Sequence, residues 1–202
     1  MKKQEQKSIT RQAEAFIPTA YGAFNLLAYA KTPKEKSPHL ALVHEKVNLH
    51  QPVLVRIHSE CITGDTFHSK RCDCGEQLEA ALKHANKEAG IVIYLRQEGR
   101  GIGLINKLKA YNLQDQGFNT AEANIHLGFD ADPRDYKDAV AILQDLNITQ
   151  INLMTNNPNK IKQLEKGGIK IIKRIPIIIT PKSENEFYLH TKQDLMGHLL
   201  NL

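Results

Sequence analysis

The feature that most constrains this 202-residue chain is its three cysteines, Cys61, Cys72 and Cys74, which lie within fourteen positions. Ten residues separate the first from the second and one separates the second from the third, so a loop must fold back to bring them together. Thiolates bind Zn²⁺ tightly, and a tetrahedral ion with three protein ligands keeps a fourth position for water or substrate. The spacing therefore predicts a catalytic zinc site on the loop of residues 61–74, the zinc loop.

Two other interpretations of the cysteines are open. A closed disulfide set cannot be built from three cysteines, and nothing in the chain indicates export. A structural zinc completed by His58 or His68 is more credible, because Cys₃His sites are common in small domains. Structural sites usually pair their ligands in two short knuckles, whereas only Cys72 and Cys74 form a close pair here. An open site is favoured.

The composition is that of an ordinary globular protein, with 41% hydrophobic and 24% charged residues. No apolar run reaches the roughly 18 to 20 residues that span a bilayer. The charged start, residues 1–7, leads into no apolar segment and does not resemble a signal peptide. We expect a cytoplasmic protein with no membrane partner, in which residues 1–15 form a flexible tail and residues 16–202 form one catalytic domain.

The net charge is +5, from 27 basic and 22 acidic residues. Such an excess suits a phosphorylated small molecule or a nucleic acid, and also arises from lysines scattered over a solvated surface. Aromatic residues make up only 6% of the chain and tryptophan is absent. Because no stretch combines aromatic and basic residues as single-strand binders do, we expect no nucleic-acid partner.

The hydrophobic pattern predicts a mixed α/β fold, with a mixed sheet, antiparallel strands near the N-terminus and strand-turn-helix units after them. We expect the strands at 40–44 and 52–58 to pair as antiparallel neighbours. The continuous apolar run at 91–95 predicts a strand buried on both faces. The remaining predicted elements are strands at 24–29, 150–155, 169–173 and 175–179, and helices at about 76–89, 104–116, from 132, 158–166 and from 191.

Residues 96–103 form a glycine-rich turn between a predicted strand and a predicted helix. Such a turn lets backbone N–H groups approach a phosphate. It matches neither the dinucleotide fingerprint nor the Walker pattern, and glycines also occur in turns simply because φ must be positive. The charged residues Arg96, Glu98 and Arg100 favour a functional role, since a tight turn requires none of them.

Two later turns carry polar residues. Asp132, Pro133 and Asp135 fit an ordinary helix start, but Arg134 would oppose the helix dipole in the first turn, which indicates a negative partner or a reactive role. Thr155 and Lys160 lie at a strand-to-helix turn. We expect them at the carboxyl edge of the sheet, where open α/β sheets bind ligands.

Several motifs together resemble the GTP cyclohydrolase II family, in the right order and over most of the chain, from about Pro18 to Leu200. They are HSECITGD at 58–65, RCDCG at 71–75, RQEGR at 96–100, LQDQG at 113–117 and LMTNNP at 153–158.

The resemblance implies a zinc- and magnesium-dependent hydrolysis of GTP that opens the imidazole ring. Formate and pyrophosphate are released, leaving 2,5-diamino-6-(5-phospho-ribosylamino)pyrimidin-4(3H)-one, in the first committed step of riboflavin biosynthesis. It implies zinc on Cys61, Cys72 and Cys74, magnesium with the GTP phosphates, and a homodimer. The amino-terminal half of fused relatives, which makes dihydroxybutanone phosphate, has no counterpart in this sequence, so we expect a monofunctional chain.

The resemblance also assigns catalytic roles. Asp132 matches the proton acceptor, and Arg134 matches a nucleophile that attacks the α-phosphorus. Because a guanidinium is a poor nucleophile, an electrostatic clamp on the phosphates is the competing role for Arg134. Tyr111 matches a catalytic position near the base and the ring-opening centre, although it also fits an ordinary amphipathic helix.

The family's GTP-contacting positions are distributed along the chain. They correspond here to Arg56, Ile57, His58, Ser59, Glu60, Gln77, Glu98, Gly99, Arg100, Thr120, Thr155 and Lys160. Among them, Arg100 and Lys160 suit phosphate, while Gln77 and Glu98 suit the edges of guanine. Two other functions stay open at this point: another zinc-dependent nucleotide hydrolase or deaminase, and a nucleic-acid-binding module with structural zinc.

Overall fold

The computed structural model describes residues 8–194 and 197–200, and within them the chain forms one seven-stranded mixed sheet. The strand order is β1-β2-β3-β5-β4-β6-β7. The predicted fold class, a mixed sheet with antiparallel N-terminal strands, is confirmed. The strands are β1 (Thr10–Thr19), β2 (Gly22–Ala30), β3 (His39–His44), β4 (Val53–Ser59), β5 (Ile91–Leu95), β6 (Gln150–Met154) and β7 (Lys170–Ile175).

The sheet has an antiparallel half and a parallel half, which meet at β5. Strands β1, β2, β3 and β5 pair antiparallel, whereas β5, β4, β6 and β7 pair parallel. The predicted neighbour relation between 40–44 and 52–58 is wrong. Strand β5 lies between β3 and β4, pairing Leu40 with Tyr94 and Ile57 with Ile93. Its apolar side chains on both faces suit this central place.

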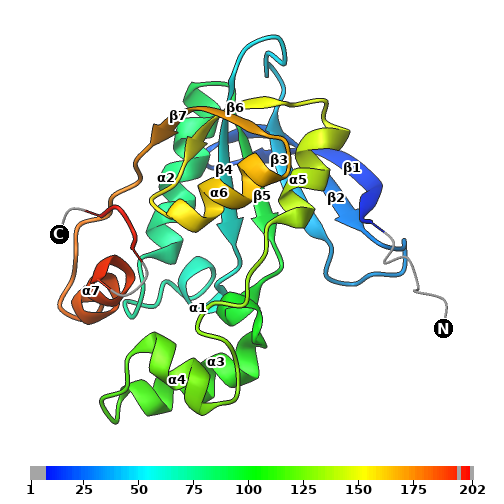
Figure 1. Cartoon of the computed structure of the whole chain (residues 1–202). Helices are drawn as coiled ribbons and strands as arrows, with labels where there is room; N and C mark the ends of the chain where they lie inside the picture. The colour runs from blue at the N-terminus through cyan, green and yellow to red at the C-terminus, as the bar shows by residue number, and fades with distance from the viewer. Residues whose placement is uncertain (1–7, 195–196, 201–202) are drawn as a thin grey trace.

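The helices lie on both faces of the sheet and beyond the carboxyl ends of its central strands. Helix α2 packs on Leu54 and Val92, while α5 and α6 pack on the opposite face against Val55 and Ile93. Figure 1 shows α1, α3, α4 and α7 beyond the carboxyl ends of β4 and β5. The helices are α1 (Ile62–Asp65), α2 (Cys74–Lys87), α3 (Gly103–Gln114), α4 (Thr120–His126), α5 (Lys137–Asp145), α6 (Pro158–Lys166) and α7 (Glu186–Asp194), with a 3₁₀ turn η1 (Glu98–Gly101).

Some predicted boundaries differ from the structure. Residues 10–15, expected within the flexible tail, form the first part of β1 and pair with β2, while residues 1–7 lie outside the described residues. Residues 169–179 contain one strand, β7, in place of two. The 191–194 segment was predicted to begin a helix, and it ends α7 instead.

The segment Asp132–Asp135 is a loop, in contrast to the predicted helix start. Asp132 accepts hydrogen bonds from the Arg134 backbone and side chain, and α5 begins only after Tyr136. The short helices α1 and α4 were not predicted. In the part of the chain that the structure describes, no helix combines the length and apolar character that a membrane crossing needs.

Candidate active site

One large cleft lies at the carboxyl ends of β4, β5 and β6, with about 1120 Å³ of empty space that is partly open to solvent. All the predicted site residues line this cleft except Ile57 and Asp132. Ile57 is fully buried in the core, and its carbonyl oxygen accepts a hydrogen bond from Lys160 at 2.7 Å. Asp132 is ion-paired to Arg134, which does line the cleft. The fold thus gathers residues that lie up to about a hundred positions apart in the sequence.

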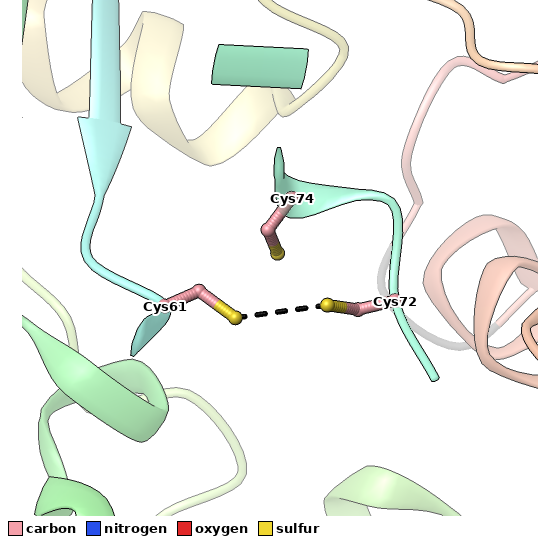
Figure 2. A group of neighbouring side chains, drawn as sticks. All are labelled: Cys61, Cys72 and Cys74. Atoms are coloured by element: carbon pink, nitrogen blue, oxygen red, sulfur yellow. Dashed lines mark hydrogen bonds between the residues drawn. The ribbon is translucent and has the colours of Figure 1, made fainter. Parts of the chain in front are cut away.

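The three cysteines converge at the start of α1 and α2, as Figure 2 shows. Their sulfur atoms lie within 4.8 Å of one another, and the Sγ atoms of Cys61 and Cys72 are 3.6 Å apart. A tetrahedral zinc with Zn–S bonds of about 2.3 Å requires sulfurs about 3.8 Å apart, so the donor set and its spacing suit zinc. Among the described residues, no histidine joins this group, which favours the open site over Cys₃His.

Two glycines let the zinc loop pack this tightly. A Cβ atom on Gly64 would lie 2.9 Å from the Cys72 Sγ and 3.0 Å from the Cys74 Cβ. A Cβ on Gly75 would lie 2.3 Å from the carbonyl oxygen of Gly64. Any larger residue at either position would therefore push the ligands apart.

Asp65 holds the zinc loop to the central strands. Its carboxylate accepts hydrogen bonds from the Cys61 backbone N–H at 2.9 Å, the Tyr94 hydroxyl at 2.8 Å and His58 Nε2 at 3.1 Å. Burial lowers the pKa of His58, so its ring is neutral and donates from Nε2 to Asp65. The ring of His58 also stacks on Tyr94, with centroids 5.5 Å apart. His58 is therefore committed to positioning the loop.

Lys107 is a buried cation beside the zinc loop. Its Nζ lies 3.1 Å from the Cys61 Sγ and 2.7 Å from Glu98 Oε1. Hydrogen bonds from the Cys72 and Cys74 thiols, together with the charge of Lys107, lower the pKa of Cys61. The site therefore stabilises a thiolate at Cys61, the form that binds metal.

Glu98 links the glycine-rich turn to the zinc loop. Besides Lys107, its carboxylate accepts from the backbone N–H groups of Ile62 at 2.6 Å and Gly99 at 2.7 Å. Since a carboxylate offers about four lone-pair sites, little capacity is left for a ligand.

The turn after β5 has an unusual backbone. The backbone φ angles of Gly99, Arg100 and Gly101 are 58°, 62° and 96°. Glycine adopts positive φ without steric cost, but Arg100 has a Cβ atom and does not. A left-handed conformation costs a non-glycine residue about 1–2 kcal/mol. Such strain is typical of functional positions. The Arg100 side chain lines the cleft, and its Nη1 lies 3.5 Å from the Ala131 carbonyl oxygen.

Asp132 and Arg134 form a two-pronged ion pair. Arg134 Nε lies 2.7 Å from Oδ1 and its Nη2 lies 2.5 Å from Oδ2 of Asp132. Burial alone would raise the pKa of Asp132, but hydrogen bonds and charge from Arg134 lower it. Burial opposes the charge of Arg134, yet Tyr136 and Asp132 raise its pKa further above its usual value. Arg134 is therefore a permanent cation in the free protein.

Arg56 and Lys160 form a second group of buried cations. Arg56 Nη1 donates to the Met154 carbonyl oxygen at 3.2 Å and its Nη2 to Gln77 Oε1 at 2.5 Å. Within the described residues, neither cation has a carboxylate partner. Burial, followed by the charges of Arg56 and Arg134, holds the pKa of Lys160 well below its usual value. An anion bound in the cleft would offset this burial cost and the repulsion between the cations, and so stabilise the charged form of Lys160.

The other predicted residues line the cleft with modest internal bonds. The Tyr111 hydroxyl lies 3.3 Å from Thr63 Oγ1, and burial raises its pKa. Thr155 Oγ1 accepts from the Asn157 backbone at 3.1 Å. Further pairs join Ser59 to Gln97, Glu60 to Arg96, and Thr120 to Gln114.

Among the residues at this site that sequence reasoning missed are Asp65, Lys107, Tyr188, Lys192 and His198. Asp65 lies inside the HSECITGD motif, and Lys107 stands one helical turn before Tyr111. The sequence therefore held a signal for both residues. The other three belong to the C-terminal segment, and no local pattern points from there to the cleft.

Comparison with known proteins places the chain in a family. The GTP cyclohydrolase II family profile matches residues 10–176. The chain is similar to proteins named riboflavin biosynthesis protein RibBA. It is 55% identical to the one from Chlorobium phaeovibrioides over 96% of this chain and 48% of that protein, and 52% identical to the one from Endomicrobium trichonymphae over 98% and 49%. The chain thus spans about half the length of the curated relatives it matches.

A solved structure of RibBX, a two-domain 3,4-dihydroxy-2-butanone 4-phosphate synthase from A. baumannii, aligns with a TM-score of 0.45 at 18% identity, covering 85% of this chain and 41% of that one. The family profile covers well over half of the chain, and the RibBA relatives are 50% to 55% identical to it over at least 96% of its length. The chain belongs to the GTP cyclohydrolase II family.

Proposed function

We propose that this protein is a zinc- and magnesium-dependent GTP cyclohydrolase II, which converts GTP to formate, pyrophosphate and 2,5-diamino-6-(5-phospho-ribosylamino)pyrimidin-4(3H)-one. This is the first committed step of riboflavin biosynthesis. The observation that carries the proposal is that three clustered thiols and several buried cations line one cleft. The reaction needs both groups. Ring opening needs a metal held by the thiols, and pyrophosphate release needs cations that stabilise the anionic phosphates.

The ring-opening half is assigned to the zinc loop. Cys61, Cys72 and Cys74 would hold the ion, which when bound supplies Lewis-acid activation of water by lowering its pKa towards about 7. Lys107 offsets the negative charge that three thiolates would concentrate. Asp65 fixes the backbone of Cys61, so that the ligand set keeps its geometry when substrate enters.

The phosphate half is assigned to Arg100, Arg134 and Lys160, with Mg²⁺ on the GTP phosphates. For Arg134 we propose the electrostatic clamp, because its bond to Asp132 and its raised pKa hold it as a guanidinium. A nucleophile would have to lose a proton that this pair retains. A phosphoryl-Arg134 adduct trapped in a mass spectrum would overturn the clamp, whereas pyrophosphate release by Arg134→Lys would support it.

Recognition of the base is assigned to Gln77 and Tyr111, with Glu98 in a supporting place. Gln77 has its amide oxygen on Arg56 and its amide nitrogen on Asp73 at 2.5 Å, so its orientation is fixed before GTP binds. Glu98 has one acceptor site left for a guanine N–H, since three donors occupy the others. The remaining predicted positions, His58, Ser59, Glu60, Gly99, Thr120 and Thr155, would contact GTP or support those contacts.

The test is an incubation of zinc-loaded protein with Mg²⁺ and GTP, following formate, pyrophosphate and the diaminopyrimidine absorbance together. We expect equal amounts of all three, lost in Cys72→Ser and kept in Lys83→Gln. Lys83 is a matched control because it lies on α2, like Cys74, but in an exposed pair with Glu79. If the wild-type protein released pyrophosphate without formate, the role of the zinc loop in ring opening would be refuted. If it released no product at all, the proposed function would be refuted.

We also propose a homodimer in the cytoplasm. Exposed apolar side chains on neighbouring helices, Ile105 and Leu108 on α3 and Ile125 on α4, support an interface with a second copy. Three free cysteines that must stay reduced to bind metal support the compartment. Light scattering after gel filtration measures the oligomeric state, and a monomer at micromolar concentration would contradict the dimer.

A further inference from the structure

The C-terminal segment, taken as residues 177–194 and 197–200, forms part of the cleft wall, although the family profile ends at residue 176. Five residues beyond that point line the cleft: Ile177, Tyr188, Lys192, His198 and Leu200. The helix of this segment, α7, carries Tyr188 and Lys192. Figure 1 shows α7 beyond the carboxyl ends of β4 and β5, apart from the sheet.

Lys192 anchors the segment to the zinc loop. Its Nζ lies 2.6 Å from Asp73 Oδ1, and the side chains are only 10% and 2% exposed. Asp73 stands between Cys72 and Cys74 in the sequence, so this pair grips the turn that carries two of the three thiols. The partners are 119 residues apart in the chain.

A relay of hydrogen bonds continues from this pair into the substrate cleft. Asp73 Oδ2 accepts from Gln77 Nε2 at 2.5 Å, and Gln77 Oε1 accepts from Arg56 Nη2 at 2.5 Å. A carboxylate only accepts and a guanidinium only donates, so the two ends of the Gln77 amide cannot be exchanged. Lys192 neutralises the carboxylate that sets this orientation.

The segment is tied down at a second place. The side chain of Asn156 donates to the Ile177 carbonyl oxygen at 2.6 Å and accepts from its N–H at 3.2 Å. The Asn156 carbonyl oxygen accepts from the Leu199 N–H at 2.9 Å. Asn156 directly follows Thr155 at the end of β6, so both ends of the segment meet at the substrate site. Between them, the Tyr188 ring lies 4.2 Å from Lys192 Nζ.

We propose that the C-terminal segment is an integral wall of the GTP site and that Lys192 is its positioning residue, which orients Gln77 and steadies the zinc loop through Asp73. The inference rests on the proposed function and adds a specific element to it. By orienting Gln77, Lys192 should tighten the binding of GTP. By steadying the zinc loop, it should slow the loss of zinc.

The full-length, zinc-loaded chain provides a matched pair of variants. Lys192→Met removes the buried pair, and Lys182→Met removes an exposed pair between the same segment and Glu76 of α2. We expect Lys192→Met to raise KM for GTP roughly tenfold or more, with a smaller change in kcat, because misplacing a binding group by about 1 Å has effects of this size. We expect Lys182→Met to change KM by less than about twofold.

Zinc transfer to a chelator is a readout independent of turnover. Lys192→Met should release zinc faster than wild type, by about tenfold if Asp73 matters as much as an outer-shell partner, whose loss typically costs about 10- to 100-fold in metal affinity, and Lys182→Met should not. Lys192→Arg, which keeps the charge, should recover part of both effects. A folded Lys192→Met protein with wild-type KM and wild-type zinc release would overturn the inference.

A measurement on the wild-type chain keeps the inference testable if Lys192→Met does not fold. Hydrogen exchange at residues 186–194 should slow when a GTP analogue with a methylene bridge between the α- and β-phosphates is added. Residues 10–30, in β1 and β2, should not change. Unchanged exchange at 186–194 in the presence of bound analogue would overturn the inference. Absence of formate release by wild type would instead refute the proposed function.

Discussion

Replacing Asp65 by alanine is expected to destabilise the zinc-free protein by roughly 3 kcal/mol. The carboxylate is the acceptor for the Cys61 N–H, the His58 ring N–H and the Tyr94 hydroxyl. Its own side chain is only 5% exposed and that of His58 only 2%. Leaving a buried donor unpaired costs about 1–3 kcal/mol, and two of the three donors here have no route to water. The partly exposed Tyr94 hydroxyl can turn to solvent and adds less.

The assay is urea unfolding followed by circular dichroism, with zinc removed so that metal binding does not add to the stability. Two further variants calibrate the result. Tyr94→Phe deletes one of the three hydrogen bonds and should cost about 1 kcal/mol. Asp65→Asn keeps one acceptor oxygen and should fall between Tyr94→Phe and Asp65→Ala.

The zinc affinities of these variants should follow the same order as their stabilities. Removing an outer-shell partner of a metal ligand typically costs about 10- to 100-fold in affinity. Asp65→Ala frees the Cys61 backbone, so it should lose zinc most readily. A loss of stability for Asp65→Ala no larger than that of Tyr94→Phe would refute the reasoning that Asp65 is the hub of the loop.

Three other perturbations have outcomes set by the structure. Gly64→Ala places a Cβ against the Cys72 sulfur, so metal analysis should find less than one zinc per chain, and full zinc content would contradict the packing argument. Arg100→Gly relieves a left-handed backbone worth about 1–2 kcal/mol, so its urea midpoint should rise or hold while KM for GTP rises; an unchanged KM would contradict the phosphate role. Burial and then the charge of Lys192 lower the pKa of His198 from 6.5 to about 3. Because the unfolded chain takes up a proton that the folded chain refuses, stability should fall as pH drops from about 6.5 to 3, and His198→Gln should reduce this slope by up to about 1.4 kcal/mol per pH unit; identical slopes would contradict it.

The zinc loop could be predicted from the sequence because its ligands are close together in the chain. The sheet order could not, since β3 pairs with β5, which lies about fifty residues later in the chain, and no local pattern specifies so distant a partner. Local capping patterns also misled at two places. The Asp132 carboxylate binds the Arg134 side chain and does not cap a helix, and the pattern at 191–194 stands at the end of α7.

The buried lysines show what a local pattern cannot contain. Lys107 and Lys192 both occur in helices, where a lysine ordinarily faces water. Each is buried because a charged or polarisable partner lies far away in the chain, Cys61 at 46 residues and Asp73 at 119 residues. Only the folded arrangement reveals such pairs. Resemblance to a family located residues that line the cleft, but not the residues that hold them in place.

The strand pairs of the sheet differ in how far apart in the chain the two partners lie, and this bears on the order of assembly. Strands β1, β2 and β3 follow one another directly, and the three thiols span fourteen residues. The pairing of β4 with β6 joins Val53 to Ile151, across a loop of almost a hundred residues. Closing long loops is slower than closing short ones. We therefore expect a newly made chain to gather its thiols, and to be able to capture metal, before the cationic end of the cleft exists.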